Sequence, residues 1–239
     1  MLKLAIPTYN RSQSIAKKTL KYLNDQGYPP PLIYLFVASE EEKVAYENAV
    51  DFYLYGHIVV GVPGLVHQRN FITQYFDDDE IIVCIDDDIE KIDCINNDFK
   101  GLVQFGHRLL SIGEAGLFGI RPNDDKRSYK LQTTTHLSFI IGSFHIRRNH
   151  HDIRLTLPQK HDYEMSILYF LRYRKIYRYL NAGIKTKYMQ NEGGLGCDVE
   201  RVNGMQECVD VLVNMYPGLC RSRQKKGMPN VELNWRYRR

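Results

Sequence analysis

Two features that would place this chain in a special class of protein are missing. Its five cysteines are an odd number and no two have C-x-x-C spacing, which argues against a disulfide framework and a zinc ribbon. Long hydrophobic runs are also absent. No segment approaches the roughly 18 apolar residues of a membrane span, and the apolar start ends at Pro7, too early for a signal-peptide core. We expect a soluble, cytoplasmic protein in a reducing compartment, without membrane contact.

A strong charge of one sign is lacking as well, because 32 Lys and Arg face 28 Asp and Glu for a net charge of +4. The distribution is more informative than the sum. Acidic residues gather at 40–42, 77–80 and 86–88, whereas basic residues gather at 172–178 and 221–239. A basic C-terminal third favours an anionic partner such as nucleic acid. A solvated basic tail is the alternative, and charge alone does not separate the two.

The first half of the chain alternates short apolar runs with segments of helical periodicity. A chain of 239 residues with 44% hydrophobic residues suits one α/β domain with a real core. Near-continuous apolar strands separated by helices predict an open, doubly wound, mostly parallel sheet. In such sheets ligands bind beyond the carboxyl ends of the strands. The expected strands are 3–6, 32–38, 57–62 and 80–85, and the expected helices are 12–23, 39–49 and 69–76.

The second half is less regular, and its last residues read as a polar, basic tail. Apolar spacing predicts helices here, and short apolar runs predict strands. The expected helices are 99–110, 162–179 and 202–215; the expected strands are 116–121, 137–144 and 185–189; a glycine-rich loop covers 191–196.

Three adjacent carboxylates, Asp86, Asp87 and Asp88, follow the fourth expected strand. Their mutual repulsion is relieved by a hard divalent cation, and Mg²⁺ or Mn²⁺ shares such ligands with substrate phosphates. In an extended segment Asp86 and Asp88 point to one side and Asp87 to the other. We therefore predict a metal site at Asp86 and Asp88. A solvated acidic turn is the alternative.

The segment Pro7-Thr8-Tyr9-Asn10-Arg11 leaves the first strand and enters the first helix. Backbone N–H groups at a helix start, together with Arg11, suit a diphosphate. Tyr9 is placed to stack on a base. The alternative is an ordinary turn in which Asn10 only caps the helix.

Two further pairs carry candidate functional groups. Arg69 and Asn70 stand at the expected start of the third helix, where they could reach a pyrophosphate or a base, or serve only as a surface arginine and a cap. Asp162 and Glu164 open the helix expected at 162–179. A carboxylate there could take a proton from an acceptor hydroxyl, although Asp and Glu are also favoured at helix starts for structural reasons.

Taken together, these motifs resemble a known family. Ile6 to Arg11, Gln68-Arg69-Asn70 and the strand ending in Asp86-Asp87-Asp88 resemble the nucleotide-sugar half of GT-A glycosyltransferases. With Gly142-Ser143-Phe144, His161 to Glu164 and Gly193-Gly194, the chain is similar to the TET/JBP-associated glycosyltransferases, relatives of the enzyme that makes base J. The resemblance implies a GT-A fold and transfer of a sugar from a UDP-sugar, with UDP-glucose the expected donor, to a hydroxymethylated pyrimidine in DNA, such as hydroxymethylcytosine.

The resemblance also implies roles for individual residues. Asp86 and Asp88 would hold Mn²⁺ or Mg²⁺, and Asp162 would be the catalytic base. The expected donor contacts are Pro7, Thr8, Tyr9, Asn10, Arg11, Arg69, Asn70, Asp86 and Asp87. The single domain would divide into a donor half at 1–95, an acceptor half at 96–220 and a basic tail at 221–239.

One departure concerns the metal. Many GT-A enzymes place a late histidine on the cation, and no histidine follows His161 here. The remaining ligands would be water and the diphosphate, or a late carboxylate such as Glu192 or Asp198.

We expect the reaction to invert the configuration at the anomeric carbon. A DNA substrate would place the protein at the nucleoid. The basic segment 172–179, expected to be helical, and the tail from Arg221 would hold the DNA backbone. Two other classes stay open: a GT-A enzyme acting on a glycan or small molecule, and a nucleotidyltransferase, which would release pyrophosphate.

Overall fold

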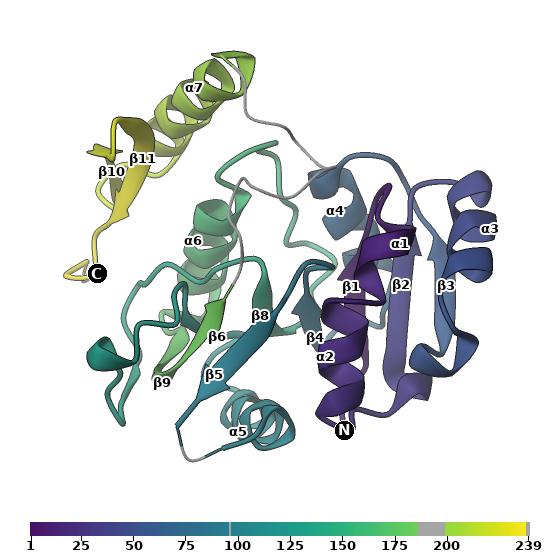
Figure 1. Cartoon of the computed structure of the whole chain (residues 1–239). Helices are drawn as coiled ribbons and strands as arrows, with labels where there is room; N and C mark the ends of the chain where they lie inside the picture. Colours follow the sequence, from purple (N-terminus) through teal and green to yellow (C-terminus); the bar gives the residue numbers. More distant parts are fainter. Residues whose placement is uncertain (96, 186–198, 238–239) are drawn as a thin grey trace.

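The computed structural model describes residues 1–95, 97–185 and 199–237. Its first half forms four parallel strands in the order β3-β2-β1-β4 (Figure 1). Side chains of β1, β2 and β4 are buried on both faces, as expected for a sheet covered on two sides, whereas the edge strand β3 is only partly buried. The strands are β1 (Leu4–Pro7), β2 (Ile33–Val37), β3 (His57–Val60) and β4 (Ile81–Ile85).

The second half extends the same sheet with a different pattern. β8 joins antiparallel to β4, β6 follows antiparallel to β8, and β9 runs parallel to β6. β5 and β7 both pair antiparallel with β9. These strands are β5 (Lys91–Cys94), β6 (Leu117–Arg121), β7 (Thr133–Thr134), β8 (Phe144–Arg148) and β9 (Tyr177–Lys185). The expected α/β sheet with a less regular second half is confirmed.

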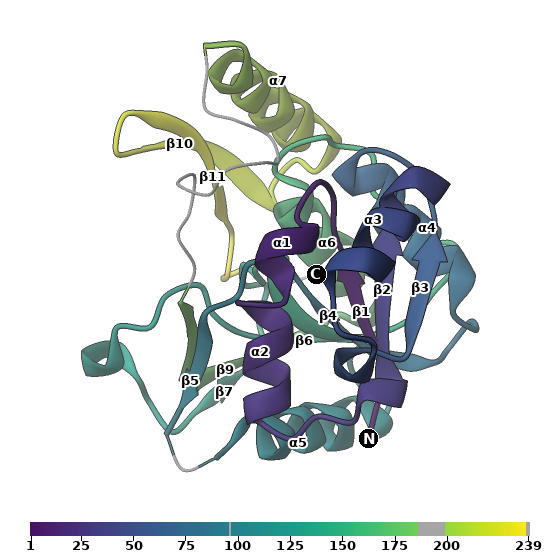
Figure 2. The same ribbon diagram turned by 45° about the vertical axis from the view of Figure 1, so that its right-hand side comes forward.

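Helices cover both faces of this sheet (Figures 1 and 2). On one face of the sheet, residues of α2, α3 and α5 pack on Leu4 and Ile6 of β1. On the other face, α4 contributes Ile72 to a cluster with Ala5, and α6 packs on β6. The helices are α1 (Ser12–Ile15), α2 (Thr19–Asp25), α3 (Glu40–Ala49), α4 (Leu65–Tyr75), α5 (Phe99–Ser111), α6 (His161–Tyr173) and α7 (Val199–Met215), with 3-10 turns η1 (Pro30–Leu32), η2 (Phe52–Leu54) and η3 (Lys126–Ser128).

Several expected boundaries were wrong. The first helix is split at 16–18 into α1 and α2. α4 begins at Leu65, four residues early, because Gly64 adopts a φ of 90° that suits glycine and takes the N-cap position. The strand expected at 137–144 begins only at Phe144. β9 runs to Lys185, and the rest of the strand expected at 185–189 lies outside the described residues.

The two basic segments also differ from expectation. α6 ends at Tyr173, where Arg174 adopts the left-handed conformation with a φ of 57°. The stretch 172–179 is therefore a helix end, a turn and a strand. The expected tail folds into a hairpin of β10 (Cys220–Lys225) and β11 (Met228–Leu233), which packs on α7 and α6 through Val231 and Leu233.

Among the described residues, no helix is both long enough and apolar enough to span a bilayer.

Candidate active site

The site begins where β1 and β4 end side by side. The two strands are parallel neighbours, with Ala5 opposite Cys84. The turn after Pro7 and the triplet from Asp86 therefore meet at one edge of the sheet, as the sequence predicts. Thr8, at the start of that turn, is only 5% exposed.

Asp87 ties these two strand ends together. Its side chain is 4% exposed in the folded chain and accepts hydrogen bonds from Thr8 Oγ1 at 2.6 Å and from Arg11 Nη1 at 2.5 Å. Burial raises the pKa of Asp87 to about 6, although Arg11 and Thr8 act in the opposite direction. Both oxygens of Asp87 are thus engaged within the protein, so its immediate role is to hold the turn in place; a direct donor contact stays a prediction.

Asp86 and Asp88 are the accessible members of the triplet, with side chains 27% and 21% exposed. Asp86 Oδ1 lies 2.8 Å from Arg69 Nη2, and Asp88 Oδ2 lies 3.3 Å from Arg11 Nη1. The alternation expected from an extended segment is therefore present, with Asp87 turned inward. Two guanidinium groups already offset much of the repulsion among the three carboxylates. Charge repulsion alone is consequently a weaker argument for a cation than it was from sequence.

The donor set nevertheless suits a hard cation. Within the described parts of the chain, no three His, Cys, Asp or Glu side chains gather into a metal-binding group. Mg²⁺ and Mn²⁺ sites that serve phosphates commonly use one or two carboxylates and complete their shell with water and substrate oxygens. Asp86 and Asp88 fit that pattern. The later candidates Glu192 and Asp198, and the pair Gly193-Gly194, lie outside the described residues.

Arg69 connects the metal candidates to the acceptor side. It lies in the second turn of α4, not at the helix start as expected, and is 7% exposed. Besides Asp86 it donates to the carbonyl of Gly142 at 3.2 Å. A Cβ atom on Gly142 would come within 2.5 Å of Asp162 Oδ1 and 3.1 Å of Arg69 Nη2. Only glycine leaves room for these two charged groups to approach one another.

Asp162 stands in the first turn of α6, beside this cluster. Its Oδ1 lies 3.0 Å from His161 Nε2. Burial would raise the pKa of Asp162, but the His161 ring, the hydrogen bond from it and the Arg69 guanidinium outweigh burial and lower that pKa well below its usual range. Asp162 is therefore an ionised carboxylate at neutral pH. Its role as catalytic base stays a prediction.

Other candidates are placed differently. Tyr9 is 52% exposed, and Asn10 adopts a φ of 53° while its N–H donates to Glu42, so it does not cap a helix. Glu164 accepts hydrogen bonds from Thr156 N, Thr156 Oγ1 and Leu157 N. That pattern makes Glu164 a loop anchor.

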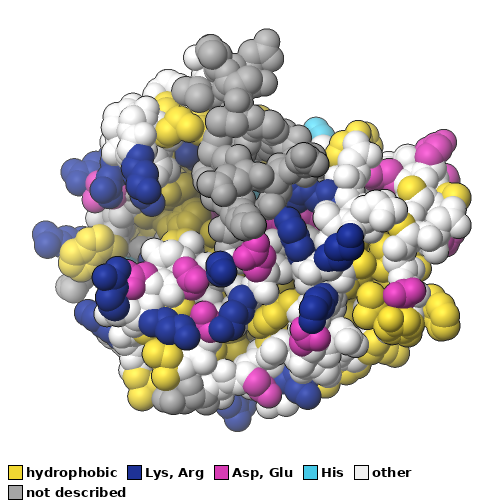
Figure 3. Space-filling view, viewed as in Figure 1, with side chains coloured by type: hydrophobic (Ala, Val, Ile, Leu, Met, Phe, Trp, Pro, Cys, Tyr) yellow, Lys and Arg dark blue, Asp and Glu magenta, His cyan; other side chains and the backbone are white. Residues whose placement is uncertain are grey.

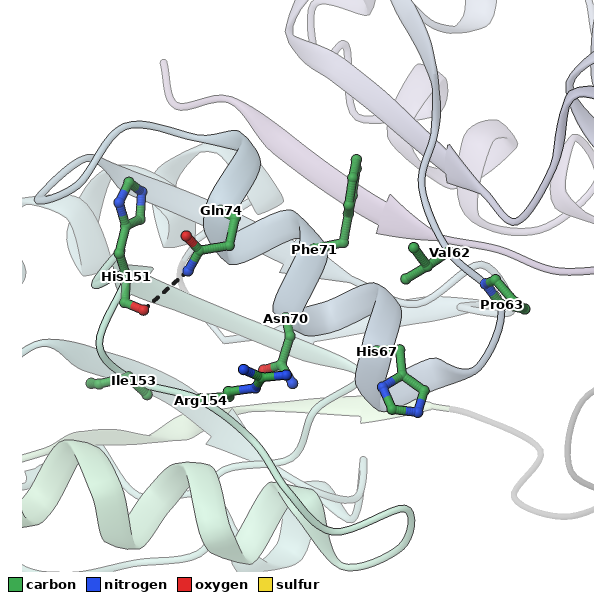
Figure 4. Close-up of a pocket in the computed structure, with 9 residues that line it drawn as sticks. All are labelled: Val62, Pro63, His67, Asn70, Phe71, Gln74, His151, Ile153 and Arg154. Carbon is green, nitrogen blue, oxygen red and sulfur yellow. Dashed lines mark hydrogen bonds between the residues drawn. The ribbon is translucent and has the colours of Figure 1, made fainter.

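Asn70 faces away from the aspartate cluster. Its side-chain amide exchanges two hydrogen bonds with the backbone of Leu155, at 2.8 and 2.9 Å. It lines an open cleft on the outer side of α4 (Figure 4). Gln74 lines the same cleft and donates to the carbonyl of His151 at 3.0 Å. Neither Arg69 nor the aspartate triplet lines this cleft, so it is separate from the aspartate cluster, and a donor contact by Asn70 stays a prediction.

Sequence reasoning missed several residues that build the site. Tyr46 of α3 lies 2.5 Å from Thr8 Oγ1 and accepts from the N–H of Arg11. Thr19 of α2 donates to the carbonyl of Asp86 and accepts from Ile89 N. A tyrosine at helical spacing and a lone threonine carry no local signal for such contacts. Glu42, whose N–H donates to the Ser39 cap, also accepts from the N–H groups of Asn10 and Ala38.

Comparisons with known proteins were made on sequence and on structure. No family model and no curated protein sequence matches this chain. Its fold matches S. aureus TarS 1–349 with a TM-score of 0.53 at 13% identity, covering 88% of this chain and 65% of that one, so the chain spans less than two thirds of TarS 1–349.

Two other solved structures match over most of their length. One is glucosyl-3-phosphoglycerate synthase from Mycobacterium tuberculosis in complex with Mn²⁺, UDP and glucosyl-3-phosphoglycerate, with a TM-score of 0.51, 12% identity, and 96% and 85% of the two chains covered. The other is mannosyl-3-phosphoglycerate synthase from Rubrobacter xylanophilus, with a TM-score of 0.50, 9% identity, and 97% and 84% covered. These neighbours have the GT-A fold, and this chain therefore has the GT-A glycosyltransferase fold.

Proposed function

We propose that this protein is a metal-dependent glycosyltransferase that uses a nucleotide-sugar, with UDP-glucose as the expected donor. One observation carries the proposal. Two accessible carboxylates, Asp86 and Asp88, stand at the carboxyl end of β4, with the buried Asp87 between them and a guanidinium beside each. Carboxylates for a cation and arginines for a diphosphate are the groups that a nucleotide-sugar requires. The GT-A fold supports the same conclusion.

The chemistry follows from the charges at this edge. A Mg²⁺ or Mn²⁺ ion held by Asp86 and Asp88 would stabilise negative charge on the leaving diphosphate. Arg11 and Arg69 supply further positive charge there. The acceptor oxygen forms a bond to the anomeric carbon, the bond from that carbon to the diphosphate oxygen breaks, and the hydroxyl proton passes to Asp162. Attack opposite the leaving group inverts the anomeric configuration.

The depressed pKa of Asp162 bears on its role as base. A carboxylate with a low pKa holds a proton weakly, so it receives the proton only as the new bond forms. Its ionised form also stays available across the neutral range.

For the acceptor, we propose a hydroxymethylated pyrimidine in DNA. Support comes from the motif resemblance of the full chain and from the cations of β10, where Arg221, Arg223 and Lys225 are all exposed. Phosphate contacts by Lys and Arg make DNA binding depend steeply on salt. A base within a duplex is out of reach of the aspartate cluster, so the acceptor nucleotide would be flipped out or single-stranded.

The experiment that tests this is UDP release from a panel of UDP-sugars with Mn²⁺, with and without hydroxymethylated DNA. Release that requires the modified DNA supports both parts of the proposal. Metal-dependent release that ignores DNA keeps the donor part and replaces DNA by a glycan or small-molecule acceptor. Absence of release with every sugar, combined with pyrophosphate release from UTP and a sugar phosphate, would replace the proposal by a nucleotidyltransferase.

A further inference from the structure

Two arginines on the acceptor half are half-buried and take part in none of the ion pairs among the described residues. Arg121 ends β6 and Arg178 lies in β9, the parallel neighbour of β6. The Nε atoms of both are buried and make no hydrogen bond. Across residues 1–95, 97–185 and 199–237, neither guanidinium forms an ion pair. Both side chains are half-buried, and Asp125, whose pKa is lowered by Arg127 and by Arg121, is exposed. A partly desolvated guanidinium is stabilised by an anion beside it.

The two guanidinium groups are also electrostatic neighbours. Burial and the charge of Arg121 together lower the pKa of Arg178, and the phenol of Tyr163 opposes them. In the sheet, Arg178 of β9 is paired with Gly119 of β6. Gly119 lies two residues before Arg121 in the same strand. Like charges on one face of neighbouring strands favour an anion between them.

Their surroundings place them beside the proposed acceptor position. Tyr163, the neighbour of Arg178, directly follows Asp162 in the first turn of α6. On another side lies His136, whose pKa is lowered by burial and by Arg178. An anion between the arginines would therefore lie on the face of the sheet that α6 covers, and the first turn of α6 carries Asp162.

An exposed aromatic ring extends this site toward the surface. The ring of His136 lies 5.9 Å from that of Trp235, which is 55% exposed. The Arg236 guanidinium lies over the Trp235 ring at 4.6 Å. Lys and Arg side chains gather over the adjoining hairpin at the upper left of the space-filling view (Figure 3). Cations interleaved with an exposed aromatic ring are the groups that bind single-stranded nucleic acid, by phosphate contacts and base stacking.

We propose that Arg121 and Arg178 bind a phosphate group of the acceptor, and that Trp235 stacks on a base next to it. This inference rests on the proposed function, in which the phosphate is a backbone phosphodiester beside the modified nucleotide. The arginines set the position of the acceptor relative to Asp162. They act on acceptor binding, not on the donor.

The test compares the wild-type chain with Arg178→Gln and with the control Arg108→Gln. Arg108 is exposed on α5, which covers the opposite face of the sheet, so the control removes the same charge elsewhere. The probes are a fluorescein-labelled single-stranded 12-mer with one hydroxymethylcytosine, followed by anisotropy, and inorganic phosphate, followed by the rise it causes in Tm. Mn²⁺-dependent UDP binding is measured by calorimetry on the same proteins.

For Arg178→Gln we expect 12-mer affinity to fall about tenfold, as for a lost hydrogen bond to a charged group, and the slope of log affinity against log salt to become shallower by about 0.7. The rise in Tm with phosphate should disappear. Without any ligand, Tm should stay equal or increase, because a half-buried charge beside the like charge of Arg121 has been removed. Arg108→Gln should change neither the 12-mer affinity and its salt slope nor the two Tm values. Trp235→Ala should weaken binding of the 12-mer and leave the rise in Tm with phosphate unchanged.

The outcomes separate this inference from the function on which it rests. Unchanged 12-mer and phosphate binding in Arg178→Gln would overturn the phosphate site, even if UDP binding persists. A lower ligand-free Tm would also count against it, because that would reveal a structural partner for Arg178. Phosphate binding through Arg178 without any 12-mer binding would keep the phosphate site and assign it to a small phosphorylated acceptor. If the wild-type chain binds the 12-mer through Arg178 but does not bind UDP, the proposed donor function fails and the phosphate site stands.

Discussion

The buried contact between Thr8 and Asp87 offers a quantitative prediction. The Thr8 hydroxyl carries one proton, which it donates to Asp87 Oδ2 at 2.6 Å. The Tyr46 hydroxyl must then be the donor to Thr8 Oγ1 at 2.5 Å. Burial raises the pKa of Tyr46 to about 12, so its proton stays in place at neutral pH. The three side chains form one chain of hydrogen bonds that ends on a buried carboxylate.

Thr8→Val keeps the shape of the side chain but breaks this chain at its centre. The carboxylate of Asp87 loses a donor and the hydroxyl of Tyr46 loses an acceptor. A buried hydrogen bond to a charged group contributes about 2 kcal/mol, so we expect the free energy of unfolding to fall by that amount. For a chain of this size, Tm should then fall by roughly 4–8 °C. Donor binding should weaken as well, because the turn that carries Arg11 is no longer held against β4.

The assay is urea unfolding and thermal unfolding of the two proteins, with Thr73→Val as the matched control. Thr73 is equally buried, but its hydroxyl only bonds back to the carbonyl of Arg69 within α4. In the Tyr46→Phe background, Thr8→Val should lower the free energy of unfolding by less than in the wild type. The Tyr46 hydroxyl, one of the two groups that would lose a hydrogen-bond partner, is already absent there. If Thr8→Val destabilises the protein no more than Thr73→Val does, the proposed chain of hydrogen bonds does not hold the site together.

Three further predictions concern carboxylates. Asp162→Asn should abolish turnover and spare Mn²⁺-dependent UDP binding; unchanged turnover would remove its assignment as base. Because the folded-state pKa of Asp162 lies below its unfolded value, its stabilisation is complete above about pH 4 and is lost as pH falls below that value. Acid-unfolding curves of Asp162→Asn should therefore be flatter in that window. Asp88→Asn should lose Mn²⁺-dependent UDP binding in calorimetry while stability changes by less than about 1 kcal/mol, since its pair with Arg11 is partly exposed; UDP binding that still responds to EDTA as in the wild type would exclude Asp88 as a ligand. Glu164→Gln should destabilise the protein by about 1.5–3 kcal/mol, because the charged acceptor of three hydrogen bonds is lost, with UDP binding unchanged; weakened UDP binding would show that Glu164 does more than anchor the loop.

Local patterns in the sequence determined the framework of this protein. Apolar runs between turn residues predicted β1 to β4, and the order of strands and helices predicted their parallel pairing. The Ser39 cap and the helix that it starts were also predictable, because both depend on neighbours within one turn. The same holds for the place of Asp86 to Asp88 at a strand end. The division of the chain near residues 95 and 220 stays a prediction.

The tertiary structure decided what each polar side chain contacts. Arg69 pairs with Asp86 because α4 begins at Leu65, directly after Gly64, and turns that arginine inward, which no local pattern specified. Asp87 is satisfied by Thr8, whose own partner Tyr46 is 38 residues away along the chain. The basic C-terminal segment forms a hairpin whose Val231 and Leu233 pack against apolar residues of α6 and α7. Secondary structure follows from short-range backbone and hydrophobic periodicity, whereas the partners of buried charges depend on which elements pack together, and that depends on the whole chain.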